Sequence, residues 1–546
     1  MGVPTLSTLS TLSTLSTLAI IFGVFNGASN AALVPRWDQG NLTDGNFDAS
    51  CAALAKSISI ENVTVNFANF VSSGTNLTFP NSDPSCTRAF QVVSTDLCRV
   101  NMNVSTSNSS GFVMEAWLPK TWTERFLSTG NGGLGGCVQY EDMAYTAQQG
   151  FAVVGTDNGH TGNGGKAFLN SPEVVADFAF RAYESHSLHM LDGTHTGVVV
   201  GKQISKLFYG SEHKKSYYLG CSTGGRQGFK SAQDFPNDFD GVVVGAPAVA
   251  FNSLNSWANH FYILTGKNTS ENFLPAPLWT TVNTEILNQC DSLDGLKDGI
   301  IEDPSLCNFD AKPLLCAPGV TDGCLTSAQV NTVTQVFTGL FGEDGSLIYP
   351  RMQPGSELQA VRLYYTGLPS PFADWYRYSV KKDPTWDPAS LTPADITLAL
   401  QQNPSNIETW KGDLSEFQAA GGKLLHWHGM QDPIISSDNS VRYYDFVSQT
   451  MGKSPAELDE FYRYFRISGT GHCSSGPGAW KIGQSILGSS EQTSQDNILM
   501  RMVDWVENGA APETVRGHKY VNDTASLGTQ FSRTRDSELV LGLDFL

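Results

Sequence analysis

The sequence predicts an α/β fold in which a mostly parallel sheet is flanked by helices and carries a large inserted domain. From about residue 151 to residue 247, β-prone runs alternate with helical stretches. This alternation is typical of strands joined by helical crossovers. It stops after residue 247 and resumes at residue 421. We therefore assign residues 32–247 and 421–546 to the core domain and residues 248–420 to an inserted domain.

The predicted elements follow in order along the chain. Residues 51–137 are rich in short β-prone runs. The alternating region then has strands in FAVVGTD from residue 151, in KSYYLG at 215–220 and in GVVVGAP from 241, with a helical stretch from about Glu173 to Leu207 and a helix from Arg226 to Gln233. Beyond the insertion come the strand GGKLLHWHG, a helix near 439–451, the strand FYRYFRISG and a helix from about Asp496 to Glu507. An insertion between late strands usually covers their carboxyl ends, where ligands bind, so we interpret residues 248–420 as a lid.

Composition restricts the function classes. With 546 residues, the chain is long enough for one large domain with an insertion, or for two domains. Hydrophobic residues make up 40% of it, which indicates a globular protein. The 53 acidic and 34 basic residues give a formal net charge of -19. This charge opposes binding to nucleic acid and to anionic membranes.

Several features predict a secreted protein. Residues 1–31 contain the apolar run LAIIFGVF followed by small residues, which resembles a signal peptide cleaved after Ala31, although no Lys or Arg precedes the run. The ten cysteines lack the spacing of a zinc site, which favours disulfides. Seven N-glycosylation acceptors occur, at Asn41, Asn62, Asn76, Asn103, Asn108, Asn268 and Asn522.

A candidate nucleophile lies between a predicted strand and a predicted helix. The string YYLGCSTGGRQG places Ser222 between Gly220 and Gly224 in a G-x-S-x-G pattern. Small residues are needed on both sides because the turn is sharp and a bulky neighbour would block the serine Oγ. The strand-turn-helix context favours the nucleophile of an α/β-hydrolase over an ordinary glycine-rich turn.

A serine nucleophile requires a base and an orienting carboxylate. Asp432 follows the strand LLHWHG, and His472 follows the next strand. Their chain order after Ser222 is the order of an α/β-hydrolase triad. Asp438 is an alternative to Asp432, and the alternatives to His472 are His426 and His428, which we expect to be packed within their strand.

Two cysteines adjoin the predicted nucleophile and base. Cys221 precedes Ser222, and Cys473 follows His472. A disulfide between them would join nucleophile and base across about 250 residues of chain, a loop worth roughly 5 kcal/mol in the chain-entropy model. Such a bridge would also fix the catalytic geometry.

At this point the sequence resembles the tannase and feruloyl esterase family, whose hallmark is this Cys-Ser, Asp, His-Cys arrangement. The resemblance extends over nearly the whole mature chain and is closest to fungal feruloyl esterases of the B type. It is carried by RFLSTGNGGLGGCV, YYLGCSTGGRQG, CDSLDGLKDGIIEDP, GGKLLHWHGMQDPIISS and MVDWVENGAAPE. It implies an α/β-hydrolase core with a large inserted lid domain, and Ser222, Asp432 and His472 as catalytic triad.

The resemblance also implies a set of disulfides. Besides Cys221 with Cys473, it suggests Cys51 with Cys98, Cys86 with Cys137, Cys290 with Cys307, and Cys316 with Cys324. The spacing of the cysteines alone leaves their connectivity open.

The glycine-rich segment from Asn131 to Gly136 follows a predicted strand. An esterase needs backbone N–H groups there, directed at the oxyanion that forms in the transition state. We expect these donors to be the amides of Thr223 and of Gly132 or Gly133.

The loop that begins at Asp291 is rich in oxygen ligands. It offers the carboxylates of Asp291, Asp294 and Asp298 and the carbonyls of Leu296 and Ile300, a donor set suited to a hard cation. The spacing does not match an EF-hand. The similar loop of the family binds calcium, so we expect a structural Ca²⁺ here rather than a solvated acidic turn.

Together these features predict a secreted serine esterase that hydrolyses feruloyl or other hydroxycinnamoyl esters of plant cell-wall polysaccharides through an acyl-enzyme. The expected partner is that phenolic ester, without a nucleotide or redox cofactor. A tannase acting on galloyl esters is the nearest alternative, and a non-catalytic binding protein on the same fold is a more distant one. The oligomeric state stays open, with a homodimer among the options.

Overall fold

The fold was analysed in a computed structural model that describes residues 46–183, 197–485, 488 and 493–537. From residue 42 onward the chain forms one compact unit. The predicted signal peptide lies outside the described residues, as does Asn41.

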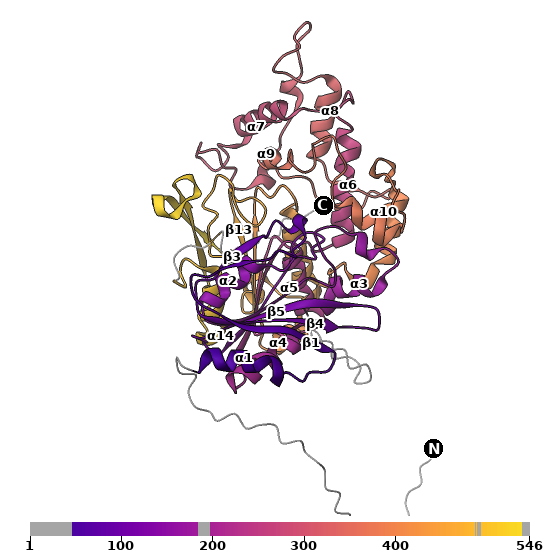
Figure 1. The fold of residues 1–546 in the computed structure, drawn as a ribbon. Coiled ribbons are helices and arrows are strands. Elements are labelled where there is room, and N and C mark those ends of the chain that lie inside the picture. Colours follow the sequence, from indigo (N-terminus) through magenta and orange to yellow (C-terminus); the bar gives the residue numbers. More distant parts are fainter. Residues whose placement is uncertain (1–45, 184–196, 486–487, 489–492, 538–546) are drawn as a thin grey trace, which may run out of the picture. The chain divides into compact units, whose positions relative to one another are not determined.

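A mixed sheet organises the core (Figure 1). Its nine strands among the described residues run in the order β1-β4-β5-β7-β6-β8-β9-β12-β13. They are β1 (Val63–Val71), β4 (Leu97–Ser105), β5 (Gly111–Pro119), β6 (Arg125–Thr129), β7 (Phe151–Thr156), β8 (Lys215–Cys221), β9 (Gly241–Gly245), β12 (Lys423–Gly429) and β13 (Tyr462–Ile467). β1, β4, β5 and β7 pair antiparallel. From β7 to β13 all pairs are parallel, which confirms the predicted α/β class.

Helices pack on both faces of this sheet, and alternate side chains of each strand enter different cores. On one face α1 (Phe47–Ser57), α4 (Gly197–Tyr209), α5 (Thr223–Asp234) and α12 (Asp438–Met451) share a core with Val242 and Val244. On the other face α2 (Tyr140–Gln148) and α14 (Ile498–Asn508) pack with Val243. This alternation buries every residue of β9.

The predicted boundaries mostly hold within a few residues. The exception is the long helix expected from Glu173 to Leu207: the structure has α3 (Pro172–Ala176), a π-helical turn at Asp177–Arg181 and α4, and residues 184–196 lie outside the described part. Helix α5 begins at Thr223, three residues before the predicted start, directly after Ser222.

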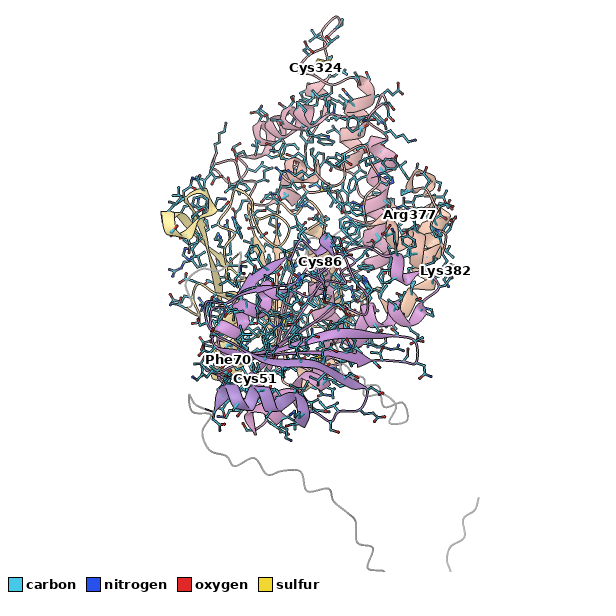
Figure 2. The ribbon with its side chains drawn as sticks, in the orientation of Figure 1. Cys51, Phe70, Cys86, Cys324, Arg377 and Lys382 are labelled. Atoms are coloured by element: carbon cyan, nitrogen blue, oxygen red, sulfur yellow. A yellow bond between two sulfur atoms is a disulfide. The ribbon has the colours of Figure 1, made fainter. Side chains whose placement is uncertain are left out.

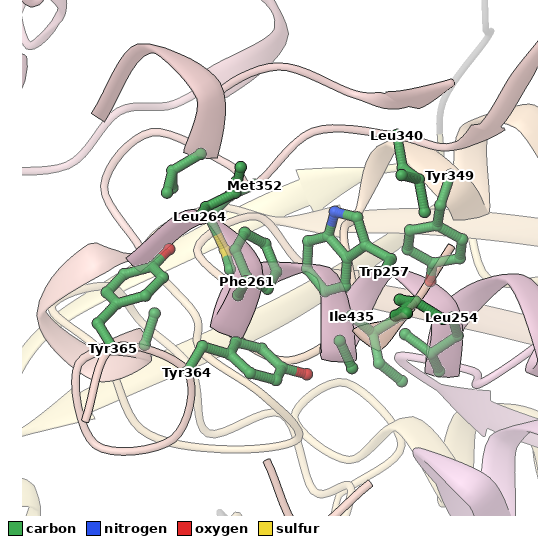
Figure 3. Close-up of a cluster of buried hydrophobic side chains, with 14 of the residues drawn as sticks. Leu254, Trp257, Phe261, Leu264, Leu340, Tyr349, Met352, Tyr364, Tyr365 and Ile435 are labelled. Carbon is green, nitrogen blue, oxygen red and sulfur yellow. The ribbon is translucent and has the colours of Figure 1, made fainter. Parts of the chain in front are cut away.

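Residues 248–420 fall between β9 and β12, where the insertion was predicted, and they build a third core. The elements of the insertion that contribute to it are α6 (Phe251–Thr265), α7 (Ala276–Cys290), α8 (Ser327–Val336), α9 (Glu357–Ala360), α10 (Pro393–Gln402), β10 (Leu340–Phe341) and β11 (Leu347–Tyr349). The last helix of the insertion, α11 (Ser415–Ala419), instead packs through Phe417 into the core that contains α5 and α12. Aromatic rings dominate it: Trp257 and Phe261 of α6 pack against Tyr364 (Figure 3). Phe168 and Phe178 of the core domain join this cluster, so it is continuous with the rest of the unit.

Short strands and helices complete the fold outside the sheet and the insertion. These are β2 (Asn76–Thr78), β3 (Phe90–Val92), α13 (Pro455–Leu458), β14 (Thr514–Tyr520) and β15 (Thr529–Asp536). β2 pairs with β3 and β14 pairs with β15, both antiparallel.

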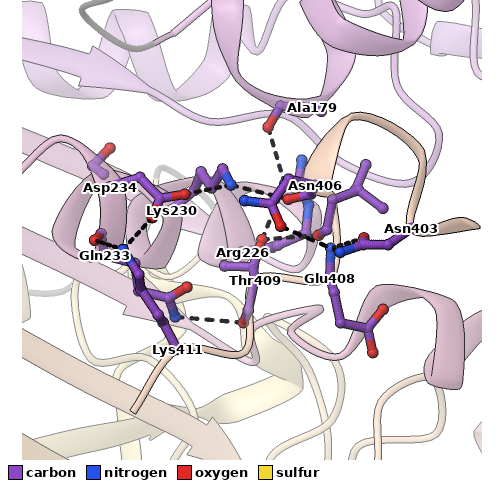
Figure 4. A network of polar contacts seen from close by, with 12 residues as sticks. Ala179, Arg226, Lys230, Gln233, Asp234, Asn403, Asn406, Glu408, Thr409 and Lys411 are labelled. Atoms are coloured by element: carbon purple, nitrogen blue, oxygen red, sulfur yellow. Dashed lines mark hydrogen bonds and ion pairs between the residues drawn. The ribbon is translucent and has the colours of Figure 1, made fainter. Parts of the chain in front are cut away.

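Polar contacts connect the end of the insertion to helix α5 (Figure 4). The fully buried Arg226 donates to the carbonyl of Ala179 at 3.1 Å. Lys230 Nζ donates to the carbonyl of Asn406 at 2.9 Å, and Lys411 pairs with Asp234 at 2.8 Å. Because α5 begins at the residue after Ser222, these contacts hold the helix that carries the candidate nucleophile.

Five disulfides join all ten cysteines (Figure 2 labels Cys51, Cys86 and Cys324). They are Cys51–Cys98, Cys86–Cys137, Cys221–Cys473, Cys290–Cys307 and Cys316–Cys324. These are the pairs that the family resemblance implies.

Candidate active site

Ser222 occupies a strained turn between β8 and α5. Its backbone has φ 65° and ψ −125°, a conformation that residues other than glycine rarely adopt. Its N–H donates to the carbonyl of Gly245 at 3.0 Å. A Cβ on Gly220 would lie 2.7 Å from the backbone of Gly224, so the turn excludes larger residues there. The G-x-S-x-G pattern therefore has a steric cause in this fold.

Asp432 and His472 meet behind the carboxyl ends of β12 and β13. His472 Nδ1 lies 2.7 Å from Asp432 Oδ2, and the other oxygen accepts the N–H groups of Ile434 and Ile435 at 2.7 and 2.9 Å. Burial by itself would raise the pKa of the Asp432 carboxyl, but the neighbouring rings of His472 and His428 outweigh burial and hold it well below its ordinary value. Asp432 is therefore ionised and fixed in orientation.

Ser222 and His472 line the same cavity, which has a volume of about 430 Å³. The disulfide between Cys221 and Cys473 holds the two backbones together, with a Cα–Cα distance of 5.9 Å. The structure thus brings the predicted nucleophile and base to one cavity and places the predicted carboxylate behind the base.

The glycine-rich loop lies against the nucleophile. Thr223 Oγ1 donates to the carbonyl of Gly133 at 2.6 Å, which ties the loop to the start of α5. The N–H of Asn131 donates to Gln227 Oε1 at 2.9 Å and is therefore already used. Gly132 and Gly133 line the cavity, and Thr223 lines a smaller adjoining pocket that also contains Ser222. Their amides remain the candidates for the oxyanion donors.

The insertion supplies much of an apolar end of the cavity. Leu363, Pro371 and Phe372 lie there, together with Leu134 and Ile434 of the core domain. The adjoining pocket extends this surface with further apolar and aromatic side chains, namely Ala248, Phe251, Leu254, Tyr364 and Ile435.

The lining of the cavity also has a polar part, the polar end, formed by Arg88, Gln139, Glu141 and Asp142, which the sequence does not predict. Arg88 Nε donates to Glu141 at 2.7 Å, and its NH2 group donates to Gln139. Asp142 is half-buried as a whole, but its Oδ1 is fully buried and has no hydrogen-bond partner among the described residues. Burial and the neighbouring Glu141 raise the pKa of Asp142 well above its usual range, to about 8, against the opposing effect of Arg88. No motif marks these residues, because the fold alone brings them together.

The alternatives to the triad lie elsewhere. His426 and His428 are fully buried within β12, as expected. Asp438 begins α12, and burial raises the pKa of its carboxyl. His428 nevertheless has an unforeseen contact, since its Nε2 lies 3.1 Å from Asp432 Oδ2.

In the acidic loop after α7, the aspartate carboxylates accept hydrogen bonds from backbone N–H groups of the same loop. Asp291 accepts the N–H of Gly299, Asp294 that of Leu296, and Asp298 that of Ile300. Within the described ranges, no three His, Cys, Asp or Glu side chains gather closely enough to hold a metal ion. The donor chemistry, carboxylate and carbonyl oxygens on one short loop, still suits a hard cation.

Two structural observations relate to the prediction that the protein is secreted. The six described glycosylation acceptors, Asn62, Asn76, Asn103, Asn108, Asn268 and Asn522, are all exposed. None of the helices in the described ranges combines the length and apolar character needed to cross a membrane.

Comparisons with known proteins identify the family of this chain. The family model "Tannase and feruloyl esterase" matches residues 98–374 and 372–537. The chain is 52% identical over 482 residues to a probable feruloyl esterase B-2 of Aspergillus oryzae, covering 88% of this chain and 90% of the relative. The crystal structure of feruloyl esterase B from Aspergillus oryzae superposes with a TM-score of 0.85 at 49% identity, covering 90% of this chain and 95% of the other. A tannin acyl hydrolase from Aspergillus niger shares the fold, with a TM-score of 0.69 at 22% identity over 90% of this chain and 91% of the other. The chain therefore belongs to the tannase and feruloyl esterase family.

Proposed function

We propose that this protein is a secreted serine esterase that hydrolyses hydroxycinnamoyl esters, such as feruloyl esters, of plant cell-wall polysaccharides. One observation carries the proposal: Ser222 and His472 share a cavity in which His472 is held by an ionised, buried Asp432. The relatives named as probable feruloyl esterases, at about half identity over most of the chain, support the choice of substrate.

The geometry suits acyl transfer through a covalent intermediate. His472 takes the proton of Ser222 Oγ while this oxygen attacks the ester carbonyl. Asp432 holds the ring with Nδ1–H toward its carboxylate, so that Nε2 is the base, and stabilises the imidazolium that forms. The amides of Thr223 and of Gly132 or Gly133 stabilise the oxyanion. His472 then protonates the leaving alcohol, and water releases the acid from Ser222 in a second round.

The two ends of the cavity fit the two halves of such an ester. The apolar end, built around Leu363 and Phe372, suits a phenolic ring. The polar end, with Arg88, Glu141 and Asp142, suits the hydroxyl groups of a sugar. An aromatic acid esterified to a carbohydrate satisfies both ends at once.

The test is the ratio of kcat/KM values for methyl ferulate, methyl caffeate and methyl gallate, measured for the wild type and the Ser222→Ala variant. We expect preference for the cinnamates and loss of turnover in the variant. A site built to bond ring hydroxyls would instead discriminate strongly for gallate, which would make the protein a tannase. Turnover that survives Ser222→Ala would exclude this serine as nucleophile, and absence of turnover in the wild type would favour a binding protein.

We further propose that the acidic loop binds a structural Ca²⁺ through Asp291, Asp294, Asp298 and the carbonyls of Leu296 and Ile300. The ion would replace the internal N–H contacts of the carboxylates and stiffen the inserted domain. A chelator should then lower the melting temperature, and added Ca²⁺ should restore it. A melting temperature that changes with neither reagent would refute the site.

Secretion and glycosylation belong to the same proposal. Six exposed acceptors and the five disulfides suit an oxidising, extracellular environment. Expression of the full chain in a fungal host should release glycosylated protein into the medium, where endoglycosidase treatment lowers its mass; protein retained in the cells would contradict this.

A further inference from the structure

A second histidine, His428, contacts the carboxylate of Asp432 in addition to His472. His428 Nε2 lies 3.1 Å from Asp432 Oδ2, the oxygen that also contacts His472, and 3.2 Å from the carbonyl of Ile435. An ionised carboxylate and a carbonyl both lack a proton to donate. The Nε2 of His428 must therefore carry the hydrogen in both contacts.

The other contacts of His428 continue away from the active site as a buried chain. His428 Nδ1 lies 2.6 Å from Ser440 Oγ, and Ser440 Oγ lies 2.9 Å from His426 Nε2. His426 Nδ1 in turn lies 3.0 Å from the hydroxyl of Tyr462. All four side chains are almost completely buried. Unsatisfied polar groups at such depth are costly, so each proton has a defined place.

The placement of the protons makes all hydrogen bonds of this chain run in one direction, from Tyr462 toward Asp432. A neutral His428 with its hydrogen on Nε2 accepts at Nδ1, so Ser440 must donate to it. Because the single proton of Ser440 is then used, His426 Nε2 must donate to the serine oxygen. His426 Nδ1 then accepts from Tyr462. The chain ends at His428 Nε2–H, which is shared between Asp432 Oδ2 and the carbonyl of Ile435.

On this basis, and resting on the esterase function proposed above, we propose that His428 is a positioning residue that fixes and polarises the Asp432 carboxylate, with Ser440, His426 and Tyr462 holding His428 in its Nε2–H form. With His428 in place, Asp432 accepts four hydrogen bonds, two on each oxygen. A carboxylate so saturated has little freedom to rotate away from His472 and little tendency to take its proton.

The titratable groups around this chain come from several elements. They are His426 on β12, Asp432 after it, Tyr443, Tyr444 and Asp445 on α12, Tyr462 and Tyr464 on β13, His472 after β13, and Tyr349 and Tyr364 of the insertion. Removing the His428 donor leaves more negative charge on the oxygen that faces His472. The imidazolium of His472 is then stabilised more strongly relative to the neutral ring.

The test replaces His428 with Phe, which removes the donor, and with Gln, whose amide Nε2 can take its place. For His428→Phe we expect kcat for methyl ferulate to fall on the order of tenfold, far less than the roughly 10⁴-fold loss typical of a removed orienting aspartate. KM should stay nearly constant, the acid limb of kcat/KM should move to higher pH, and His428→Gln should restore most of the rate. An unchanged pH limb in His428→Phe, or equal losses in both variants, would overturn the proposal.

Two further measurements do not depend on the folding of the Phe variant. Ser440→Ala interrupts the hydrogen-bond chain while keeping His428, and it should lower kcat less than His428→Phe. The matched control is Ser437→Ala, which changes another buried serine at the start of the same helix. In the wild type, ¹⁵N NMR of labelled histidines should show His426 and His428 as Nε2–H tautomers. An Nδ1–H tautomer at His428 would contradict the proposal whether or not the protein hydrolyses feruloyl esters.

Discussion

Two carboxyls near the cavity, Asp432 behind His472 and Asp142 in the lining, differ in the direction of their pKa shifts. Asp432, behind His472, is fully buried yet accepts four hydrogen bonds, and the two histidines beside it hold its pKa low. Asp142, at the polar end, keeps a buried oxygen without a partner in the described part of the chain, and its pKa is raised to about 8. Burial acts on both in the same direction, so the donors around each carboxyl decide its charge.

This difference separates catalysis from recognition. The donors around Asp432 come from the chain itself, so its charge is ready before substrate arrives, as electrostatic preorganisation requires. Around Asp142 the described chain leaves one carboxyl oxygen without a donor, and the residue lines the cavity beside Arg88 and Glu141, whose polar groups suit a ligand with hydroxyl groups. The first region should therefore control kcat, and the second should control the choice of leaving group.

The largest effect should come from neutralising the first carboxyl. Asp432→Asn keeps the shape but offers an amide donor to His472, which favours the wrong tautomer, so we expect kcat for methyl ferulate to fall by about 10⁴-fold. The control is Asp438→Asn, which changes the alternative acid on the same part of the chain and should leave kcat nearly unchanged. A loss confined to Asp438→Asn would transfer the orienting role to that residue.

A smaller effect should follow from opening the polar end. Arg88→Ala removes the guanidinium that orders Glu141 and Gln139. We expect kcat/KM for a feruloylated arabinose to fall roughly tenfold, the scale of one lost charged hydrogen bond, while methyl ferulate, which has no sugar, is turned over as before. Arg125→Ala is the matched control, because Arg125 forms a similar two-point pair with Glu507 elsewhere. Equal losses on both esters would mean that this end does not bind the sugar.

The two regions also differ in how much of each could be predicted from the sequence. The turn at Ser222 was predictable, because its glycines have local steric causes. The parallel strands and the place of the insertion followed from periodicity. Arg88 and Glu141, which form the ion pair beside Asp142, come from segments separated by about fifty residues, and no local pattern marks them. For His428 the sequence predicts only a packed strand residue, because periodicity indicates burial but not which polar groups meet inside.

The smallest effect, in stability, tests the charge of Asp142 directly. Its pKa near 8 in the folded state exceeds the ordinary value of 3.8, so the folded state keeps a proton that the unfolded state has released between these pH values. The contribution of this carboxyl to stability is therefore complete below pH 4 and declines as pH rises to 8. Asn cannot ionise, so the melting temperature of Asp142→Asn relative to wild type should be lowest near pH 4 and rise by a few degrees up to pH 9. The control is Asp344→Asn, because Asp344 is an exposed carboxyl whose pKa is lowered by Ser346; it is ionised in both states above pH 4, so its difference should stay flat from pH 4 to pH 9. A flat difference for Asp142→Asn would mean that this carboxyl is ionised like Asp432. The two carboxyls would then differ in their hydrogen-bond donors rather than in their charge.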